Sequence, residues 1–147
     1  MTHKDAGKYS TKHRSGTIIN EQVAKMVREK SPDGEIACVT CEKISKELEV
    51  EISEVGITVD LLEIKVKKCQ LGLFGYGKKP NHGKDIKAAD SVSDEMKCAI
   101  EEAAENGEVT CAALWTIADR LGTKRKEVSS ACETLKLKIR ECQLGTF

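Results

Sequence analysis

The chain of 147 residues carries 24 basic and 24 acidic side chains, so its formal net charge is zero and it has no general attraction for a phosphate backbone. No apolar run approaches the roughly 20 residues needed to span a bilayer, and the basic residues 1–17 precede no apolar stretch of the kind a secretory signal needs. We therefore expect a cytoplasmic protein with no membrane partner.

The chain opens with a basic tail, residues 1–17, which we expect to be flexible. A first unit, residues 18–76, then begins with an amphipathic helix, for which Asn20 is a suitable N-cap and Gly34 a suitable stop. The pattern next predicts a short strand (EIACVT), a second helix (CEKISKELEV), a third helix (EISEVGITVDLLE) and a half-buried strand (IKVKKCQLG).

Residues 77–92 have the composition of a linker, with lysines, glycines and one proline. The second unit, residues 93–147, repeats the order of the first unit. Its first helix is capped by Ser93 and stopped by Gly107, and the pieces EVTCAA, ALWTIADRLGT, KRKEVSSACETLK and LKIRECQLG follow. Each unit closes on Cys-Gln-Leu-Gly, which we interpret as a strand brought back across the helices.

The two units align without a gap when residues 21–74 are placed on residues 94–147, and 15 of 54 positions are then identical. Apolar positions stay in phase over the whole span, which indicates an internal duplication. Units of this size bury little surface alone. We expect the two to pack on each other, and a homodimer is a further expectation.

The second and third helices of the second unit resemble the helix-turn-helix superfamily. The resemblance rests on Ala118, Gly122 and Val128, which match its small residue, turn glycine and anchoring aliphatic residue. In the first unit Glu49 stands in place of the glycine. The flanking strands make each unit similar to a winged helix, although only one strand follows the third helix. The whole chain also resembles a small uncharacterised family of tandem units with a repeated Cys-Gln-Leu-Gly ending.

The resemblance implies that the third helix of the second unit contacts double-stranded DNA. The residues predicted to do so are Lys124, Arg125, Lys126, Ser129 and Ser130, together with Lys8, Lys12 and Arg14 of the tail. The third helix of the first unit is acidic and would repel phosphate. Our first hypothesis is that the chain is a DNA-binding protein, with transcriptional regulation as its candidate role. The alternative is an adaptor that uses the same units to bind another protein.

Seven cysteines form a third candidate feature. Three interpretations remain open for them: buried hydrophobic side chains, a thiol–disulfide pair in each unit, or a metal or redox sensor. The candidate positions are Cys38, Cys41, Cys69, Cys111 and Cys142. Cys98 and Cys132 lie within predicted helices, where we expect them to fill the core. No phosphate-binding glycine loop or nucleophile elbow occurs, so we expect neither an enzyme nor a cofactor.

The sequence thus predicts a mainly α-helical protein with short β-strands, built from two tandem winged-helix-like units.

Overall fold

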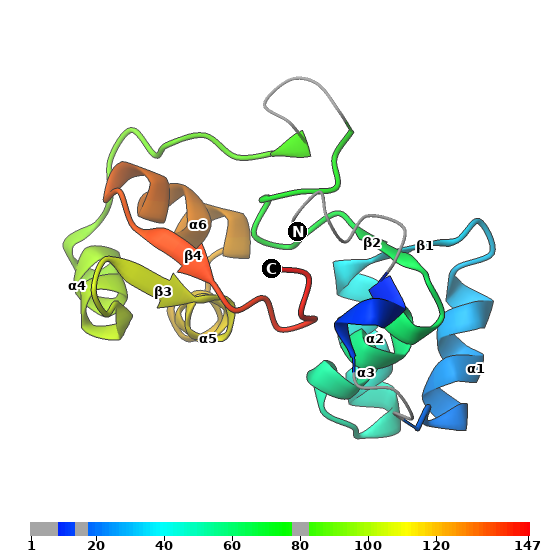
Figure 1. The fold of residues 1–147 in the computed structure, drawn as a ribbon. Helices are drawn as coiled ribbons and strands as arrows, with labels where there is room; N and C mark the ends of the chain where they lie inside the picture. The colour runs from blue at the N-terminus through cyan, green and yellow to red at the C-terminus, as the bar shows by residue number, and fades with distance from the viewer. Residues whose placement is uncertain (1–8, 14–17, 78–82) are drawn as a thin grey trace. The chain divides into compact units, whose positions relative to one another are not determined.

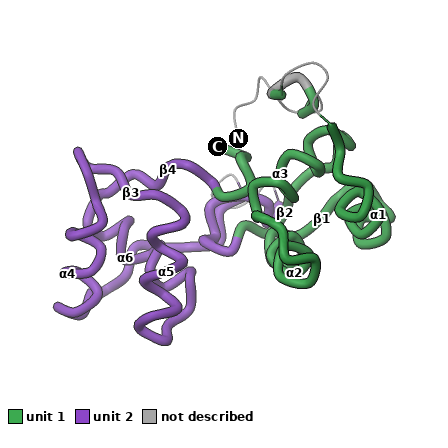
Figure 2. Tube along the Cα trace, turned by 90° about the horizontal axis from the view of Figure 1, so that it is seen from below, with its two compact units in different colours: residues 1–69, 143–147 green, residues 70–142 purple. Residues whose placement is uncertain are grey.

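The computed structural model describes residues 9–13, 18–77 and 83–147, and in these ranges the protein is mainly helical with short strands (Figure 1). The chain forms two compact units (Figure 2). Unit 1 comprises residues 1–69 and 143–147, and unit 2 comprises residues 70–142. These boundaries differ from the expected ones, 18–76 and 93–147, because the last residues of each predicted unit belong to the other unit.

Unit 1 has the order helix, strand, helix, helix, strand. Its elements are α1 (Glu21–Lys30), β1 (Glu35–Ala37), α2 (Cys38–Leu48), α3 (Ile52–Leu61) and β2 (Lys65–Lys67), preceded by a short 3-10 helix, η2 (Tyr9–Lys12). Unit 2 has the same order, in α4 (Asp94–Ala103), β3 (Glu108–Thr110), α5 (Cys111–Leu121), α6 (Arg125–Thr134) and β4 (Lys138–Arg140). Each element of unit 2 starts and ends 73 residues after its counterpart in unit 1.

The first helix of each unit begins where the sequence predicts. The Asn20 side chain accepts hydrogen bonds from the backbone N–H groups of Gln22 and Val23, and the Ser93 side chain accepts one from Met96. The predicted stops were wrong by a few residues, since Ser31 and Ala104 are the C-caps. In unit 1 the residue after the C-cap is a proline, which disfavours helical backbone at the residue before it.

Gly34 and Gly107 instead turn the chain into the following strand, with φ of +79° and +77°. The sharp turn between the second and third helices also uses left-handed backbone, at Gly122 in unit 2 and at Glu49 in unit 1. The glutamate therefore adopts the same conformation as the glycine, at a cost of roughly 1 kcal/mol.

The core of each unit is aliphatic and lies between its three helices and its sheet. The fully or almost fully buried side chains include Val27, Ile36, Ile44 and Val55 in unit 1, and Ile100, Val109, Ile117 and Val128 in unit 2. Each of the first four stands 73 positions before one of the second four. Burial of aliphatic groups, at about 25 cal/mol per Å² of apolar surface, is the main stabilising contribution in units with so few aromatic residues.

The strand before the second helix pairs with the strand after the third helix in both units. The pairing is parallel, with Ile36 opposite Val66 in unit 1 and Val109 opposite Ile139 in unit 2. Among the described residues each sheet has two strands, so neither sheet contains the antiparallel hairpin that forms a wing.

Candidate functional site

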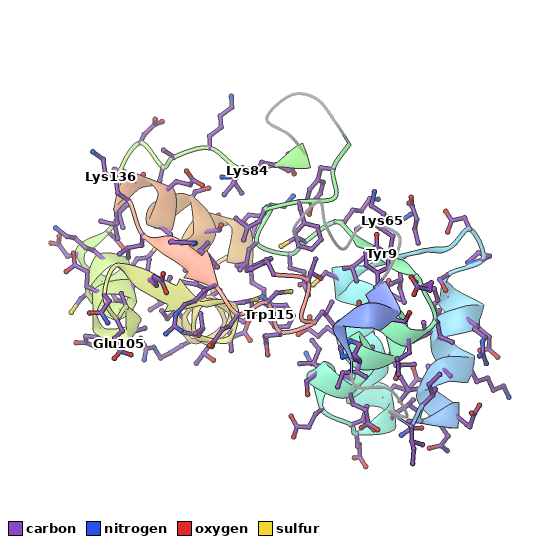
Figure 3. All side chains as sticks on the ribbon, in the orientation of Figure 1. Tyr9, Lys65, Lys84, Glu105, Trp115 and Lys136 are labelled. Carbon is purple, nitrogen blue, oxygen red and sulfur yellow. The ribbon has the colours of Figure 1, made fainter. Side chains whose placement is uncertain are left out.

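The third helix of unit 2, α6, carries the residues predicted to contact DNA. Trp115, which is labelled in Figure 3, comes from α5. The Arg125 guanidinium lies 3.9 Å from the centroid of the Trp115 ring. Its Nη1 donates a hydrogen bond to Gln70 Oε1 over 2.9 Å, and its Nη2 lies 3.3 Å from Asp119 Oδ2. The Arg125 side chain is only 14% exposed. Arg125 is thus engaged on three sides within unit 2.

The next basic residue of α6 is also engaged. Lys126 Nζ forms an ion pair with Asp85 and lies 4.4 Å from the ring centroid of Tyr76. The hydrogen bond to Asp85 raises the pKa of Lys126, and Tyr76 adds to this effect. Ser129 is fully buried and Ser130 is half-buried. Of the five residues predicted on or beside α6, only Lys124 is exposed.

Residues 84–89, which we call the strap, lie along α6 and hold its polar groups. Lys84 Nζ donates to Glu133 Oε1 over 2.9 Å, the Ala89 N–H donates to the Ser130 carbonyl, and Thr134 Oγ1 donates to the Ala89 carbonyl. A cavity of about 890 Å³ is bounded by the strap, α6 and Met96 of α4. The predicted linker, residues 77–92, is therefore in this part a packed element of unit 2.

The third helix of unit 1 is covered in a similar way by η2. The backbone N–H groups of Tyr9 and Ser10 donate to the Glu63 carboxylate, each over 2.9 Å. The hydrogen bonds from Ser10 lower the pKa of Glu63, with a smaller effect from Tyr9. His13 Nε2 lies 2.8 Å from Asp60 Oδ2 at the end of α3, and Tyr9 is buried. Lys8 and Arg14 lie outside the described residues, as does the Lys12 side chain.

Each third helix also contacts a Gln-Leu-Gly segment, and that segment follows the last strand of the other unit. In unit 2, Gln70 binds Arg125, Leu71 is fully buried, and the Gly72 carbonyl accepts from the Asp85 N–H over 2.8 Å. A Cβ at Gly72 would lie 2.4 Å from Ile86 Cγ2 of the strap. The strap and the segment therefore pack closely together.

In unit 1 the corresponding segment is residues 143–147, and it lies against Gly56 of α3. Leu144 is 3% exposed. A Cβ built on Gly56 would lie 2.4 Å from the Leu144 carbonyl oxygen and 2.8 Å from its Cα. Only a residue without a side chain allows the backbone of this segment to approach the helix so closely. The expectation that each ending crosses the helices of its own unit was therefore wrong.

The cysteines occupy different places from those expected. Cys38 and Cys111 are the first residues of α2 and α5 rather than strand residues, and both are buried, as are Cys41 and Cys69, whereas Cys142 is half-buried. Since Ala37 pairs with Lys67, Cys38 and Cys69 both follow the same end of their sheet. In the described ranges no three His, Cys, Asp or Glu side chains are grouped as a metal site. The redox interpretation stays a prediction.

The two remaining cysteines behave differently from each other. Cys132 is fully buried on α6, as expected, and desolvation raises its pKa to about 12, with a smaller contribution from Glu133. Cys98 is exposed on α4, so the expectation that it fills the core was wrong. Its Sγ lies 3.5 Å from Glu102 Oε1, and this contact raises its pKa.

The sequence analysis did not predict that Gly56, Gln70 and Trp115 take part in the contacts between the third helices and the Gln-Leu-Gly segments. Trp115 is 7% exposed, and its indole Nε1 is buried without a hydrogen-bond partner among the described residues. The signal that could have found the site is the repeated Gln-Leu-Gly itself. A conspicuous, uncharged tripeptide that recurs at equivalent positions is a candidate ligand for an equivalent surface.

No protein-family model matches the chain, and no curated protein or solved structure is significantly similar to it. Within the described ranges no helix combines the length and apolar character required to cross a membrane.

Proposed function

We propose that the protein is a non-enzymatic protein-interaction module, whose third helices bind extended, uncharged segments containing Gln-Leu-Gly. The observation that carries the proposal is the approach of the Leu144 backbone to Gly56, where an added Cβ would lie 2.4 Å from the carbonyl oxygen. A helix surface that admits the backbone of another segment this closely is shaped for a peptide. The cytoplasm, expected from the sequence, remains the proposed location.

The second unit supports the same proposal. There Arg125 of α6 holds Gln70 by a side-chain hydrogen bond, and the next residue, Leu71, is fully buried. The equal spacing of the elements in the two units further leads us to infer that one helix-turn-helix-like unit was duplicated. Each copy then kept its third helix as a docking surface for the ending of the other copy.

DNA binding by α6 is the less favoured candidate. It would require Lys126 to exchange Asp85 for a phosphate and Arg125 to leave Trp115 and Gln70. Both lysine and arginine would lose intramolecular partners before gaining new ones, which reduces the net free energy of binding. Lys124 is exposed and would be available without such a change.

The test uses the full chain with Leu144→Asp, a substitution that places a charge in a buried apolar position and releases residues 143–147 from α3. A fluorescent synthetic peptide with the sequence of residues 142–147 is titrated onto this variant and binding is followed by anisotropy. We expect saturable binding that is lost when Gly56→Val is added. Ser53→Val is the matched control, because it puts the same side chain on an exposed position of α3 and should leave peptide binding unchanged.

A second arm titrates duplex DNA onto the wild-type chain and the Asp85→Ala variant at several salt concentrations. The proposal predicts no steep salt dependence in either. DNA affinity that falls strongly with salt and weakens with Lys124→Ala, combined with no peptide binding, would replace the protein-docking proposal with the DNA-binding one.

A further inference from the structure

Beside the start of its docking helix, unit 2 has a group of polar contacts from α5 and α6 that unit 1 lacks. Arg125 Nη1 donates to Gln70 Oε1, while the arginine is stacked on Trp115 and paired with Asp119. We infer that Trp115, Asp119 and Arg125 form a glutamine-reading site, so that unit 2 selects docked segments by the side-chain amide before Leu-Gly. This inference rests on the proposed docking function and names the chemistry that α6 recognises.

In this site Arg125 donates the hydrogen bond to the glutamine, while Trp115 and Asp119 hold the arginine side chain in place. The Trp115 ring lies under the guanidinium plane, and such stacking holds the long arginine side chain in one conformation. The Arg125 Nη2 donates a hydrogen bond to Asp119 Oδ2, and the Arg125 Nη1 donates to Gln70 Oε1. A preformed donor of this kind loses little conformational entropy when a ligand arrives.

Because the site is buried, this hydrogen bond can discriminate between segments with and without an acceptor at this position. The Arg125 side chain is 14% exposed and Trp115 is 7% exposed, so a segment with no acceptor at this position would cover the guanidinium without replacing its hydrogen bond. A buried donor left without its partner is penalised, which is why sites built around polar groups reject analogues that lack the matching group. A segment with an apolar residue in place of glutamine should therefore be discriminated against.

Unit 1 provides an internal comparison. At the positions 73 residues earlier stand Glu42, Lys46 and Ile52 in place of Trp115, Asp119 and Arg125. Glu42 and Lys46 form an ion pair with each other over 3.2 Å, and isoleucine has no side-chain donor. Unit 1 thus recognises its segment by the close approach at Gly56, and it has no equivalent means of reading Gln143.

The experiment uses the full chain with Gln70→Ala and Leu71→Asp, which remove the acceptor that Arg125 holds and place a charge at the fully buried leucine, so that the segment is released. Two peptides are compared, one with the sequence of residues 69–74 and one with alanine in place of the glutamine. Trp115 is the only tryptophan in the chain, so its fluorescence reports this site. We expect the glutamine peptide to bind at least about tenfold more tightly than the alanine peptide, equivalent to about 1.4 kcal/mol.

Two controls separate recognition from packing. Adding Arg125→Met, which keeps an apolar side chain over Trp115, should bring the ratio of the two affinities to about one. The same glutamine-to-alanine change in the peptide of residues 142–147 should leave its affinity for unit 1 of the Leu144→Asp variant unchanged, because Ile52 stands at the position of Arg125. Three results would overturn the inference: equal affinities of the two 69–74 peptides for the Gln70→Ala, Leu71→Asp variant, a ratio of affinities that Arg125→Met leaves unchanged, or absence of binding by both peptides.

The failure of this inference is distinguishable from that of the proposed function. Binding of the 142–147 peptide to the Leu144→Asp variant, with equal affinities of the two 69–74 peptides at unit 2, would remove the glutamine-reading site and leave the docking function. Absence of peptide binding at both units would remove both.

Discussion

Substitution of Gly56 by alanine gives the most direct measure of segment docking. Gly56 lies inside α3, where replacing glycine by alanine normally stabilises a helix by about 1 kcal/mol. With residues 143–147 in place, however, the new Cβ would lie 2.4 Å from the Leu144 carbonyl oxygen and 2.8 Å from its carbonyl carbon. Both are backbone atoms, so no side-chain rotation can relieve the overlap, and the segment must move away.

The net effect follows from two opposed contributions. Displacing the segment exposes Leu144, which is 3% exposed when docked, and burial of a leucine side chain contributes about 1.5–3 kcal/mol. Subtracting the gain in helix propensity leaves unit 1 less stable by about 1 kcal/mol. In the Leu144→Asp background the segment is already released, so Gly56→Ala should stabilise the same unit by about 1 kcal/mol. The sign of the effect therefore reverses.

Hydrogen exchange of the α3 amides, followed by NMR, measures the opening free energy of unit 1 in the four proteins of this double-mutant cycle. Trp115 fluorescence during urea unfolding follows unit 2 and should be unaffected by Gly56→Ala. If alanine stabilises α3 equally with and without Leu144, the segment does not lie on Gly56 and the docking argument fails.

Three further predictions concern buried or charged groups. Ser129→Ala should stabilise unit 2 by about 1 kcal/mol in urea unfolding followed by Trp115 fluorescence, because the Ser129 Oγ is buried without a partner among the described residues. The raised pKa of Cys132, about 12 against 9.0, means that the folded state holds its proton more tightly. The stability that this contributes is complete below pH 9 and declines as pH rises towards 12, and Cys132→Val should flatten that decline in alkaline unfolding curves. The lowered pKa of Glu63 works in the opposite direction, since its contribution is present above pH 4.5 and is lost as pH falls through the folded-state pKa. The Tyr9 amide shift should titrate with that pKa, and a titration that persists in Glu63→Gln would contradict this assignment.

Local patterns were sufficient to predict the order of helices and strands. Asn20 and Ser93 were predictable as N-caps because the side-chain oxygen that satisfies the first backbone N–H groups is a property of one residue and its neighbours. The aliphatic periodicity likewise indicated which faces would be buried, as at Val55 and Val128. These signals extend over at most a few turns of helix.

The docking arrangement could not be predicted because it depends on contacts between distant residues. Gln70 and Arg125 are 55 positions apart, and the predicted linker shows no periodicity that would place Asp85 beside Lys126. The two Gln-Leu-Gly segments are identical in sequence, so no local rule assigns either of them to one unit. The close contact between Gly56 and the Leu144 backbone distinguishes the segment of residues 143–147, and this contact is visible only in the folded structure.

The charges of the two third helices restrict what can bind both. The helix α3 carries Glu54 and Asp60, whereas α6 begins with Arg125 and Lys126, so a charged ligand that suits one helix is repelled by the other. The segments that both helices hold, residues 70–74 and 143–147, contain no charged side chain. Burial of the leucine, which is common to both segments, tolerates either sign of surrounding charge. Under the proposed function, two docking helices of different surface charge share a common ligand only if that ligand is neutral, and a phosphate backbone does not meet this condition.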